Sequence, residues 1–319
     1  MKIVVRLALV FSGLFSLAAF FTSLTKAWSL NITSLDERET LNYHFSLYLP
    51  DNRNSFFTGI IEGAERAASE LHSAISIHSI DPAKNELEMA SYTGVDGVIV
   101  CPYLDDSLAR RQLEKLGRIP VVLVNHNITN DQPWPFIGTN NFDMGRRIGL
   151  ISMRLKPVSE NPEPLRLAVV YSDKAPGIYA ERELVEMGMA SALGDTLDFP
   201  VMSFKTNLNP LDAEALLYRL FRDQPEDINT IVFTDSSDTV AAAQTLVDMN
   251  LVGRVRVIGF GADPGVLENI RKGIVACSVV IDSEKIGYEA VRSLTALRTT
   301  GYTSATIDTG IEIITGSGL

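Results

Sequence analysis

Cysteine, histidine and positive charge are all scarce in this chain of 319 residues. Its 28 Lys and Arg side chains stand against 39 Asp and Glu, which gives a formal net charge of −11. A nucleic-acid-binding face needs a clustered basic patch, and the body of the chain has no such cluster, so we expect no nucleic-acid partner. Hydrophobic residues make up 46% of the chain, which is enough for a sizeable core.

Sequence signatures of enzymes are missing as well. The chain has no Gly-x-Ser-x-Gly motif, no Gly-rich phosphate-binding loop and no His-x-x-x-His metal pair. The four histidines are scattered, at positions 44, 72, 78 and 126, and none has an evident partner in the sequence. We therefore expect a protein that is not an enzyme and that holds neither a metal nor a cofactor.

The two cysteines, Cys101 and Cys277, each lie in an apolar, strand-like run, GVIVCP and GIVACSVV. Two cysteines of an exported protein can form a disulfide, but these surroundings favour two separate buried thiols that pack as small hydrophobic side chains. Their spacing matches no metal-ligand pattern.

The N-terminal segment 1–27 differs from the rest of the chain. Two positive charges, Lys2 and Arg6, precede an uncharged apolar run over 7–24, and Thr25-Lys26-Ala27 follows. This order is typical of a secretory signal peptide, but a run of about 18 residues also reaches the length of a membrane-spanning helix. The segment is thus either a cleaved signal peptide or an uncleaved anchor, and we expect a periplasmic or cell-envelope location. No cysteine follows the run, which excludes lipid attachment at a mature N-terminal Cys.

Residues 28–42 lack periodicity and are interpreted as a linker, after which strand and helix patterns alternate. Strands are predicted at 43–49, 74–80, 96–102, 119–125, 135–139, 166–172, 201–205, 228–234, 255–260, 274–281 and 305–315. Helices are predicted at 55–71, 82–92, 105–117, 141–155, 178–193, 210–222, 236–249, 263–272 and 284–300. A proline-rich break at 156–166 interrupts the alternation.

Most predicted strands are continuous apolar runs, as expected for parallel sheets that are buried on both faces. Alternation with helices on both sides of the break predicts two doubly wound α/β units. In open α/β sheets, ligands bind at the carboxyl ends of the strands, where the short loops of this chain place polar residues.

The order of several segments resembles the type I periplasmic binding proteins, the sugar-binding family that also supplies the effector domains of LacI-type repressors. The resemblance covers about residues 43 to 315 and is carried by LPDNRNSFFTGIIEGAERAA, GVDGVIVCP, IPVVLVN, FIGTNNFDMGRRIG, VIGFGADP and IRKGIVACSVVIDSEKIGYEAV. It implies two lobes joined by a three-segment hinge, with the ligand between them. The first lobe would be 43–140 plus 282–303, and the second 141–281 plus 304–319.

Ligand-binding candidates come partly from sugar chemistry and partly from the resemblance. A sugar ring offers an apolar face for Phe56 or Phe57 and a rim of hydroxyls for Asn54; we expect one phenylalanine in the core and the other toward the cleft. The resemblance adds residues that match the family's binding positions: Asn125, His126, Asn141, Arg182, Asp235, Ser236 and Asp263. Asn140 and Asn141 are also placed to cap the helix that follows them, as is any one of Asp235, Ser236 and Asp238.

Two departures from the family pattern weaken the expected polar site. The family's Gly-Phe-Asp is Gly259-Phe260-Gly261 here, and Ile281 stands where the family has a hinge glutamine. Whether Asp263 substitutes for the missing aspartate is left open. A less polar second-lobe site implies a modified or less hydroxylated ligand, or a recruited protein partner.

Two functions fit this interpretation. The first is an exported solute-binding protein that closes on a sugar-like ligand and delivers it to the permease of an ABC importer. The second is a sensory binding protein that presents its ligand-bound form to a membrane receptor or histidine kinase. A DNA-binding repressor is disfavoured, because an apolar export segment occupies the place of the family's helix-turn-helix.

Overall fold

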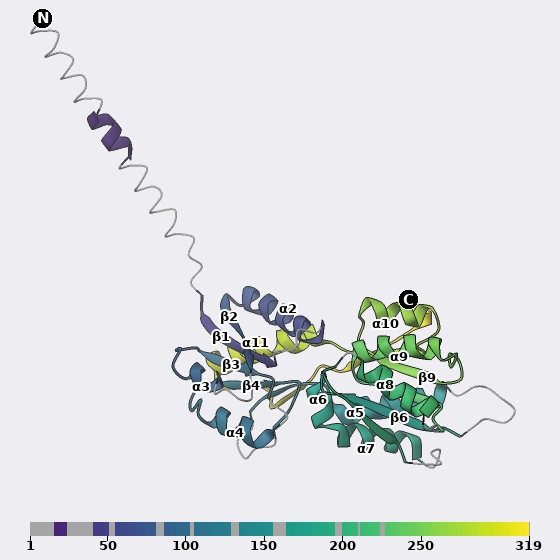
Figure 1. Ribbon diagram of the computed structural model, residues 1–319. Coiled ribbons are helices and arrows are strands. Elements are labelled where there is room, and N and C mark those ends of the chain that lie inside the picture. The colour runs from purple at the N-terminus through teal and green to yellow at the C-terminus, as the bar shows by residue number, and fades with distance from the viewer. Residues whose placement is uncertain are drawn as a thin grey trace, which may run out of the picture. The chain divides into compact units, whose positions relative to one another are not determined.

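The computed structural model forms two compact units, residues 1–42 and 43–319 (Figure 1). It describes residues 16–23, 41–50, 55–80, 86–102, 105–128, 134–155, 164–194, 200–209, 211–223 and 227–318. In the first unit, residues 16–23 form an exposed helix; the other residues of the predicted signal or anchor, and most of the predicted linker, lie outside the described residues. Within the described ranges, no helix has the length and apolar character needed to cross a membrane.

The second unit contains two six-stranded sheets. The first has the order β11-β5-β4-β3-β1-β2, and all its strand pairs are parallel. In chain order its strands are β1 (Tyr43–Pro50), β2 (Ser73–Ile80), β3 (Gly97–Val100), β4 (Val121–Val124), β5 (Phe136–Gly138) and β11 (Thr306–Asp308). Its helices are α2 (Ser55–Glu70), α3 (Glu86–Ala90), α4 (Asp106–Glu114) and α11 (Ser283–Thr300).

The second sheet has the order β12-β10-β9-β8-β6-β7. Its strands are β6 (Leu167–Ser172), β7 (Met202–Thr206), β8 (Thr230–Phe233), β9 (Arg256–Phe260), β10 (Cys277–Ile281) and β12 (Ile311–Thr315), and β12 alone among them pairs antiparallel. Its helical segments are α5 (Asn141–Arg154), α6 (Pro176–Ala180), α7 (Arg182–Leu193), α8 (Asp212–Tyr218), the π-helical turn Arg219–Asp223, α9 (Ser236–Asp248) and α10 (Pro264–Arg271).

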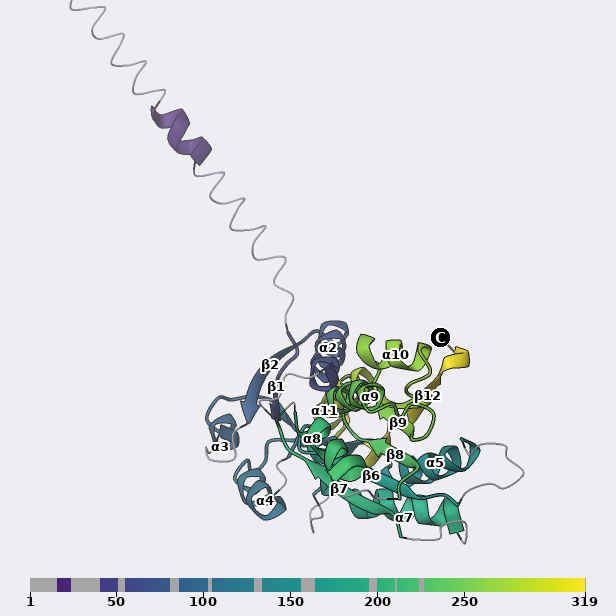
Figure 2. The ribbon, with the colours of Figure 1, turned by 45° about the vertical axis from the view of Figure 1, so that its right-hand side comes forward.

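The predicted fold class is confirmed. Both sheets share the doubly wound order in which the second strand lies at one edge and the first lies inside it. Strands β3 and β4 are buried along their whole length, as continuous apolar runs require. Helices α2 and α11 lie side by side over the first sheet (Figures 1 and 2), because Gly63 and Gly287 let the two backbones touch where a Cβ would overlap the neighbouring helix.

Two predicted elements are divided in the structure. The predicted helix 178–193 begins two residues earlier and breaks at Glu181, so it forms α6 and α7. The predicted strand 305–315 breaks at Thr309-Gly310, where Gly310 has a φ of +72° and its N–H donates to Asp308 Oδ1 at 2.9 Å. Strand β11 then belongs to the first sheet and only β12 to the second, so assigning all of 304–319 to the second lobe was wrong.

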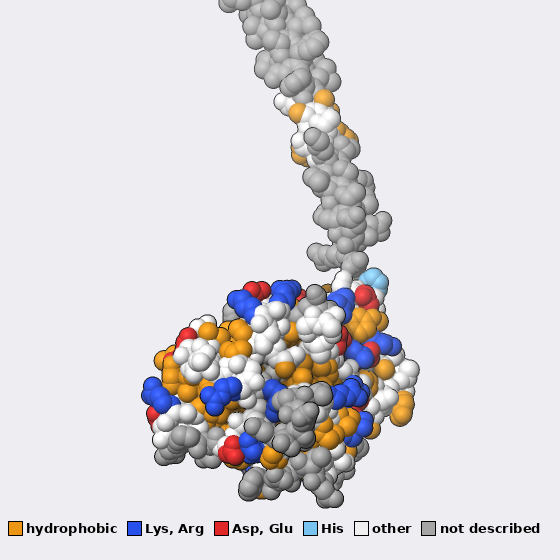
Figure 3. Space-filling model, turned by 90° about the vertical axis from the view of Figure 1, so that its right-hand side faces the viewer, with side chains coloured by type: hydrophobic (Ala, Val, Ile, Leu, Met, Phe, Trp, Pro, Cys, Tyr) orange, Lys and Arg blue, Asp and Glu red, His pale blue; other side chains and the backbone are white. Residues whose placement is uncertain are grey.

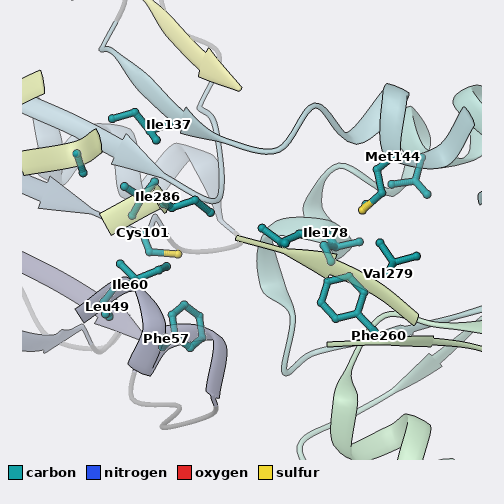
Figure 4. Packing of buried hydrophobic residues seen from close by; sticks show 14 of the residues in the cluster. Leu49, Phe57, Ile60, Cys101, Ile137, Met144, Ile178, Phe260, Val279 and Ile286 are labelled. Atoms are coloured by element: carbon teal, nitrogen blue, oxygen red, sulfur yellow. The ribbon is translucent and has the colours of Figure 1, made fainter. Parts of the chain in front are cut away.

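A hydrophobic core cluster extends through both lobes (Figure 4). Leu49, Phe57 and Ile60 lie on the first-sheet side, and Ile178 and Phe260 on the second. The cluster also includes both cysteines, which are fully buried and unbonded to each other, as predicted. Burial raises the pKa of each of the two thiols to about 12.

Candidate functional site

The candidate site is a cavity of about 230 Å³ at the carboxyl ends of strands from both sheets. First-lobe residues that line it follow β1 and β4, and second-lobe residues follow β6 and β8 or lie at and beyond the last residues of β9 and β10. This is the edge where doubly wound sheets bind ligands, because the first and third strands of each unit send their connections to opposite faces and leave a crevice between them.

One wall of the cavity is apolar. Phe56 lies half-buried at the start of α2, and the second lobe contributes Ile178, Phe260, Val280 and Ile281 to the same lining. Its neighbour Phe57 is 2% exposed and belongs to the core cluster. The two rings meet edge to face, with centroids 5.3 Å apart. The prediction of one inward and one cleft-facing phenylalanine is therefore confirmed, since adjacent helix residues point in different directions.

The second lobe also contributes a buried ionic cluster. Lys174, which follows β6, is 9% exposed, and its ammonium lies 2.5 Å from Asp238 Oδ1 and 3.7 Å from Asp235 Oδ1. The second carboxylate oxygen of Asp238 accepts a hydrogen bond from Thr206 Oγ1. Since the lysine and both aspartates are buried, the ammonium and the carboxylate of Asp238 offset each other's charge.

Asp235 caps α9, as its position predicts: its Oδ1 accepts from the backbone N–H of Asp238 at 3.0 Å. Ser236 lines the cavity beside Gly261, whose φ is +81°. A Cβ at Gly261 would come within 3.0 Å of the Ser236 side chain. A side chain at this position would therefore be strained and crowded, which explains why this site has no acidic group on residue 261.

Asp263 lies two residues beyond Gly261 and also lines the cavity. It occupies the N-cap position of α10, yet its side chain makes no capping hydrogen bond. Its Oδ2 is buried and finds no hydrogen-bond partner among the described residues.

Asn125 reaches the cavity from the end of β4 with a φ of +63°, a conformation that Asn tolerates better than most residues. It is 8% exposed, and its amide nitrogen lies 3.8 Å from Cys101 Sγ. Gly177 of α6 packs directly against it from the second lobe: a Cβ on Gly177 would overlap the Asn125 backbone oxygen and come within 2.6 Å of Nδ2. The two lobes thus touch at this point.

Three predicted site residues line a different cavity of about 640 Å³. His126 is 2% exposed, with Nε2 3.0 Å from Asp106 Oδ1. The side chain of Asn141 donates to Glu181 Oε2 at 2.7 Å, and the guanidinium of Arg182 lies over the ring of Tyr179, 5.2 Å from its centroid.

The structure therefore brings Phe56, Asn125, Asp235, Ser236 and Asp263 together at the first cavity, but not His126, Asn141, Arg182 or the core residue Phe57. Asn54 lies outside the described residues. Sequence analysis missed Lys174 and Ile178. Lys174 did carry a signal, because a polar residue just beyond the buried strand LAVVYS lies at the ligand-binding edge.

The arrangement suits binding by packing and hydrogen bonds. Over the described part of the chain, no group of three or more His, Cys, Asp or Glu side chains is placed to hold a metal ion.

A family model described as the periplasmic binding protein domain matches residues 45–301. Among solved structures, a glucose-galactose binding protein, GanP, from Geobacillus stearothermophilus is similar at 20% identity and a TM-score of 0.72, over 87% of this chain and 98% of that one. A carbohydrate transporter solute-binding protein from Agrobacterium radiobacter, in complex with D-arabinose, has 16% identity and a TM-score of 0.72, over 87% and 96%.

A chain of a XylFII–LytSN complex is 21% identical, with a TM-score of 0.69 and coverage of 87% and 99%. A search of curated proteins found no match. Since the family model spans most of the chain and the two doubly wound sheets match the solved folds, this chain belongs to the family of type I periplasmic binding proteins.

Proposed function

We propose that this protein is an exported solute-binding protein that closes its two lobes on a sugar or sugar-like ligand and delivers it to an ABC importer. The observation that carries the proposal is the cavity at the carboxyl ends of both sheets, with Phe56 and Asn125 contributed by one lobe and Lys174, Asp235 and Asp263 by the other. The matching family consists of solute-binding proteins, which supports a role in binding and not in catalysis.

Closure requires surfaces that meet in one state and part in another. The lobes are joined by three chain segments, between β5 and α5, between β10 and α11, and between β11 and β12. Beside this hinge, Asn125 meets Gly177, and the backbone N–H of Asn127 donates to Glu181 Oε1 at 3.3 Å. A ligand that contacts both lobes favours the closed state by the difference between its affinities for the two states.

The cavity lining matches a small ligand that has one apolar face and one rim of hydrogen-bonding groups. Phe56, Phe260 and Ile281 offer apolar area to the face of a sugar ring, and polar groups such as Asn125 and Ser236 offer hydrogen bonds to its rim. A cavity of about 230 Å³ lies below the roughly 300–1,000 Å³ of typical drug-sized sites, which fits a single monosaccharide ring.

The test is a thermal-shift screen of the purified protein against neutral, deoxy, amino and acidic monosaccharides, followed by calorimetric titration of each hit. A ligand at 100 times its Kd stabilises the folded state by about 2.7 kcal/mol, which gives a measurable rise in Tm. Phe56→Ala should weaken binding of the same ligand, because it removes the first-lobe apolar contact. Failure of every sugar to raise Tm would refute sugar binding.

A sensory role is the second candidate, favoured by the similarity to a chain of the XylFII–LytSN complex. Here the closed protein would contact a membrane receptor or histidine kinase instead of a permease. Uptake of the labelled ligand by cells lacking the gene separates the two: loss of uptake supports delivery to an importer, and normal uptake with loss of ligand-induced transcription supports sensing. Fractionation of cells expressing the full chain tests export and whether segment 1–27 is cleaved or remains as an anchor.

The distribution of charge on the surface does not favour a nucleic-acid partner. On the face in Figure 3, Lys and Arg side chains are spaced around apolar areas and do not form a continuous basic band. This agrees with the net charge of −11.

A further inference from the structure

Asp263 is the one described side chain lining the ligand cavity that has a buried polar atom lacking a hydrogen-bond partner. A buried carboxylate oxygen without a donor costs free energy that a bonded one does not. An aspartate at an N-cap normally recovers this cost by accepting from the second or third N–H of its helix, but Asp263 makes no such bond. Its carboxylate is therefore available to a hydrogen-bond donor from outside the protein.

The charges around the cavity select the kind of donor. The described lining and its ionic cluster hold one cation, Lys174, against three carboxylates, Asp235, Asp238 and Asp263. Lys174 lies within ion-pair distance of the first two, and Asp263 has no such partner in the described part of the chain. The N-termini of α9 and α10 each add roughly half a positive charge, which leaves the lining net negative. Such a lining disfavours acidic ligands and favours a cation.

The remaining lining limits the number of hydroxyls that the ligand can satisfy. Ile281 and Gly261 stand where the resemblance expects a glutamine and an aspartate, and Phe260 and Val280 extend the apolar wall. A hydroxyl placed against these apolar residues would lose its water without gaining a hydrogen-bond partner, which is unfavourable. The ligand should therefore carry fewer hydroxyls than a simple hexose.

We propose that the ligand is a protonated amino sugar of monosaccharide size, whose ammonium donates to Asp263 while its less polar edge lies on Phe260 and Ile281. An amino sugar satisfies both conditions, because one hydroxyl is replaced by a cationic donor. The proposal rests on the proposed function of the same cavity and specifies the class of sugar.

The experiment compares calorimetric Kd values at mildly acidic pH for three matched sets: glucosamine and galactosamine, their neutral parent sugars, and their N-acetyl forms. We expect the best amine to bind at least roughly tenfold more tightly than its parent and its N-acetyl form, since hydrogen bonds to charged groups are the stronger kind. Asp263→Asn keeps the shape but removes the charge, and should bring the amine and its parent to within about twofold of each other. Asp248→Asn, an exposed change on α9, is the matched control and should leave the preference intact.

Each result decides between the two proposals. Tight binding of neutral sugars with no preference for the amine overturns the amino-sugar inference and leaves sugar binding standing. Preference for the amine that survives Asp263→Asn overturns the role of Asp263. No binding by any of the sugars overturns both the inference and the proposed function.

Discussion

Gly177→Ala should weaken ligand binding without destabilising the empty protein. Gly177 lies on α6 of the second lobe and faces Asn125 of the first, and a methyl group there would overlap the Asn125 backbone oxygen. It would also lie 2.6 Å from Asn125 Nδ2, where ordinary contacts begin at 3.4 Å. The shortest of these distances is 2.4 Å, to the Asn125 backbone oxygen, so the lobes must part by roughly 1.0 Å at this point to admit the methyl group.

The expected size of the effect follows from this overlap. Overpacking at a tight contact costs about 1–3 kcal/mol. If the lobes relieve it by opening, the whole cost falls on the closed, ligand-bound state, and Kd rises roughly 5- to 150-fold. If the lobes of the ligand-free protein stand apart at this point, the added methyl group meets no clash there and the Tm should hardly change.

The assay pairs calorimetric titration of the best ligand with thermal unfolding in its absence. Gly316→Ala serves as the matched control, because the nearest atom to its added methyl group, Ile270 O, would lie at an ordinary 3.7 Å. An unchanged Kd for Gly177→Ala would refute a closure in which these surfaces meet. A fall in the Tm of the ligand-free protein comparable to the loss of binding would show that the contact belongs to the rigid fold and not to a moving interface.

Three further results are expected. Phe57→Ala should lower the free energy of unfolding by about 3–5 kcal/mol in urea titrations, because a buried ring is lost, whereas Phe56→Ala should largely spare stability and weaken binding; equal losses of stability would contradict this division. Lys174→Met should destabilise the fold by about 3–5 kcal/mol by leaving the Asp238 carboxylate buried and unpaired, and Asp238→Asn in the same chain should recover part of the loss of Tm. Burial raises the pKa of both cysteine thiols to about 12, so iodoacetamide at about pH 8 should modify neither until urea unfolds the protein; labelling of the folded protein would contradict their burial.

Most of the fold could be predicted from the sequence because local pattern and final environment agree. The runs that form β3 and β4 are continuously apolar and are buried along their whole length. A continuous apolar run therefore predicts both a strand and its position inside a parallel sheet. The breaks were harder to see. Gly310 ends the first strand through its positive φ and its bond to Asp308, and the apolar residues on either side of it have the pattern of one strand although they join different sheets.

The site was predictable only where the direction of a side chain follows from periodicity. Phe56 and Phe57 could be divided between cleft and core because neighbouring helix residues diverge. Asn125 and His126 are also neighbours, yet the positive φ of Asn125 turns the chain so that they line different cavities. The break at Glu181 likewise places Arg182 at the start of a new helix beside the larger cavity. Neither the turn at Asn125 nor the break at Glu181 could be predicted from the local pattern of polar and apolar residues.

What separates the proposed ligand-binding aspartate, Asp263, from the structural ones is also a three-dimensional property. Asp235, Asp238 and Asp263 all lie at or near the start of a helix that follows a buried strand, and their sequence surroundings are alike. Asp235 accepts from the N–H of Asp238 and the hydroxyl of Ser237, and Asp238 is paired with Lys174 and Thr206. Only at Asp263, among these three, does a carboxylate oxygen stay buried and unbonded. A protein that must release its ligand gains by keeping such a group unsatisfied when empty, because the ligand's donor then supplies a hydrogen bond that exists only in the bound state.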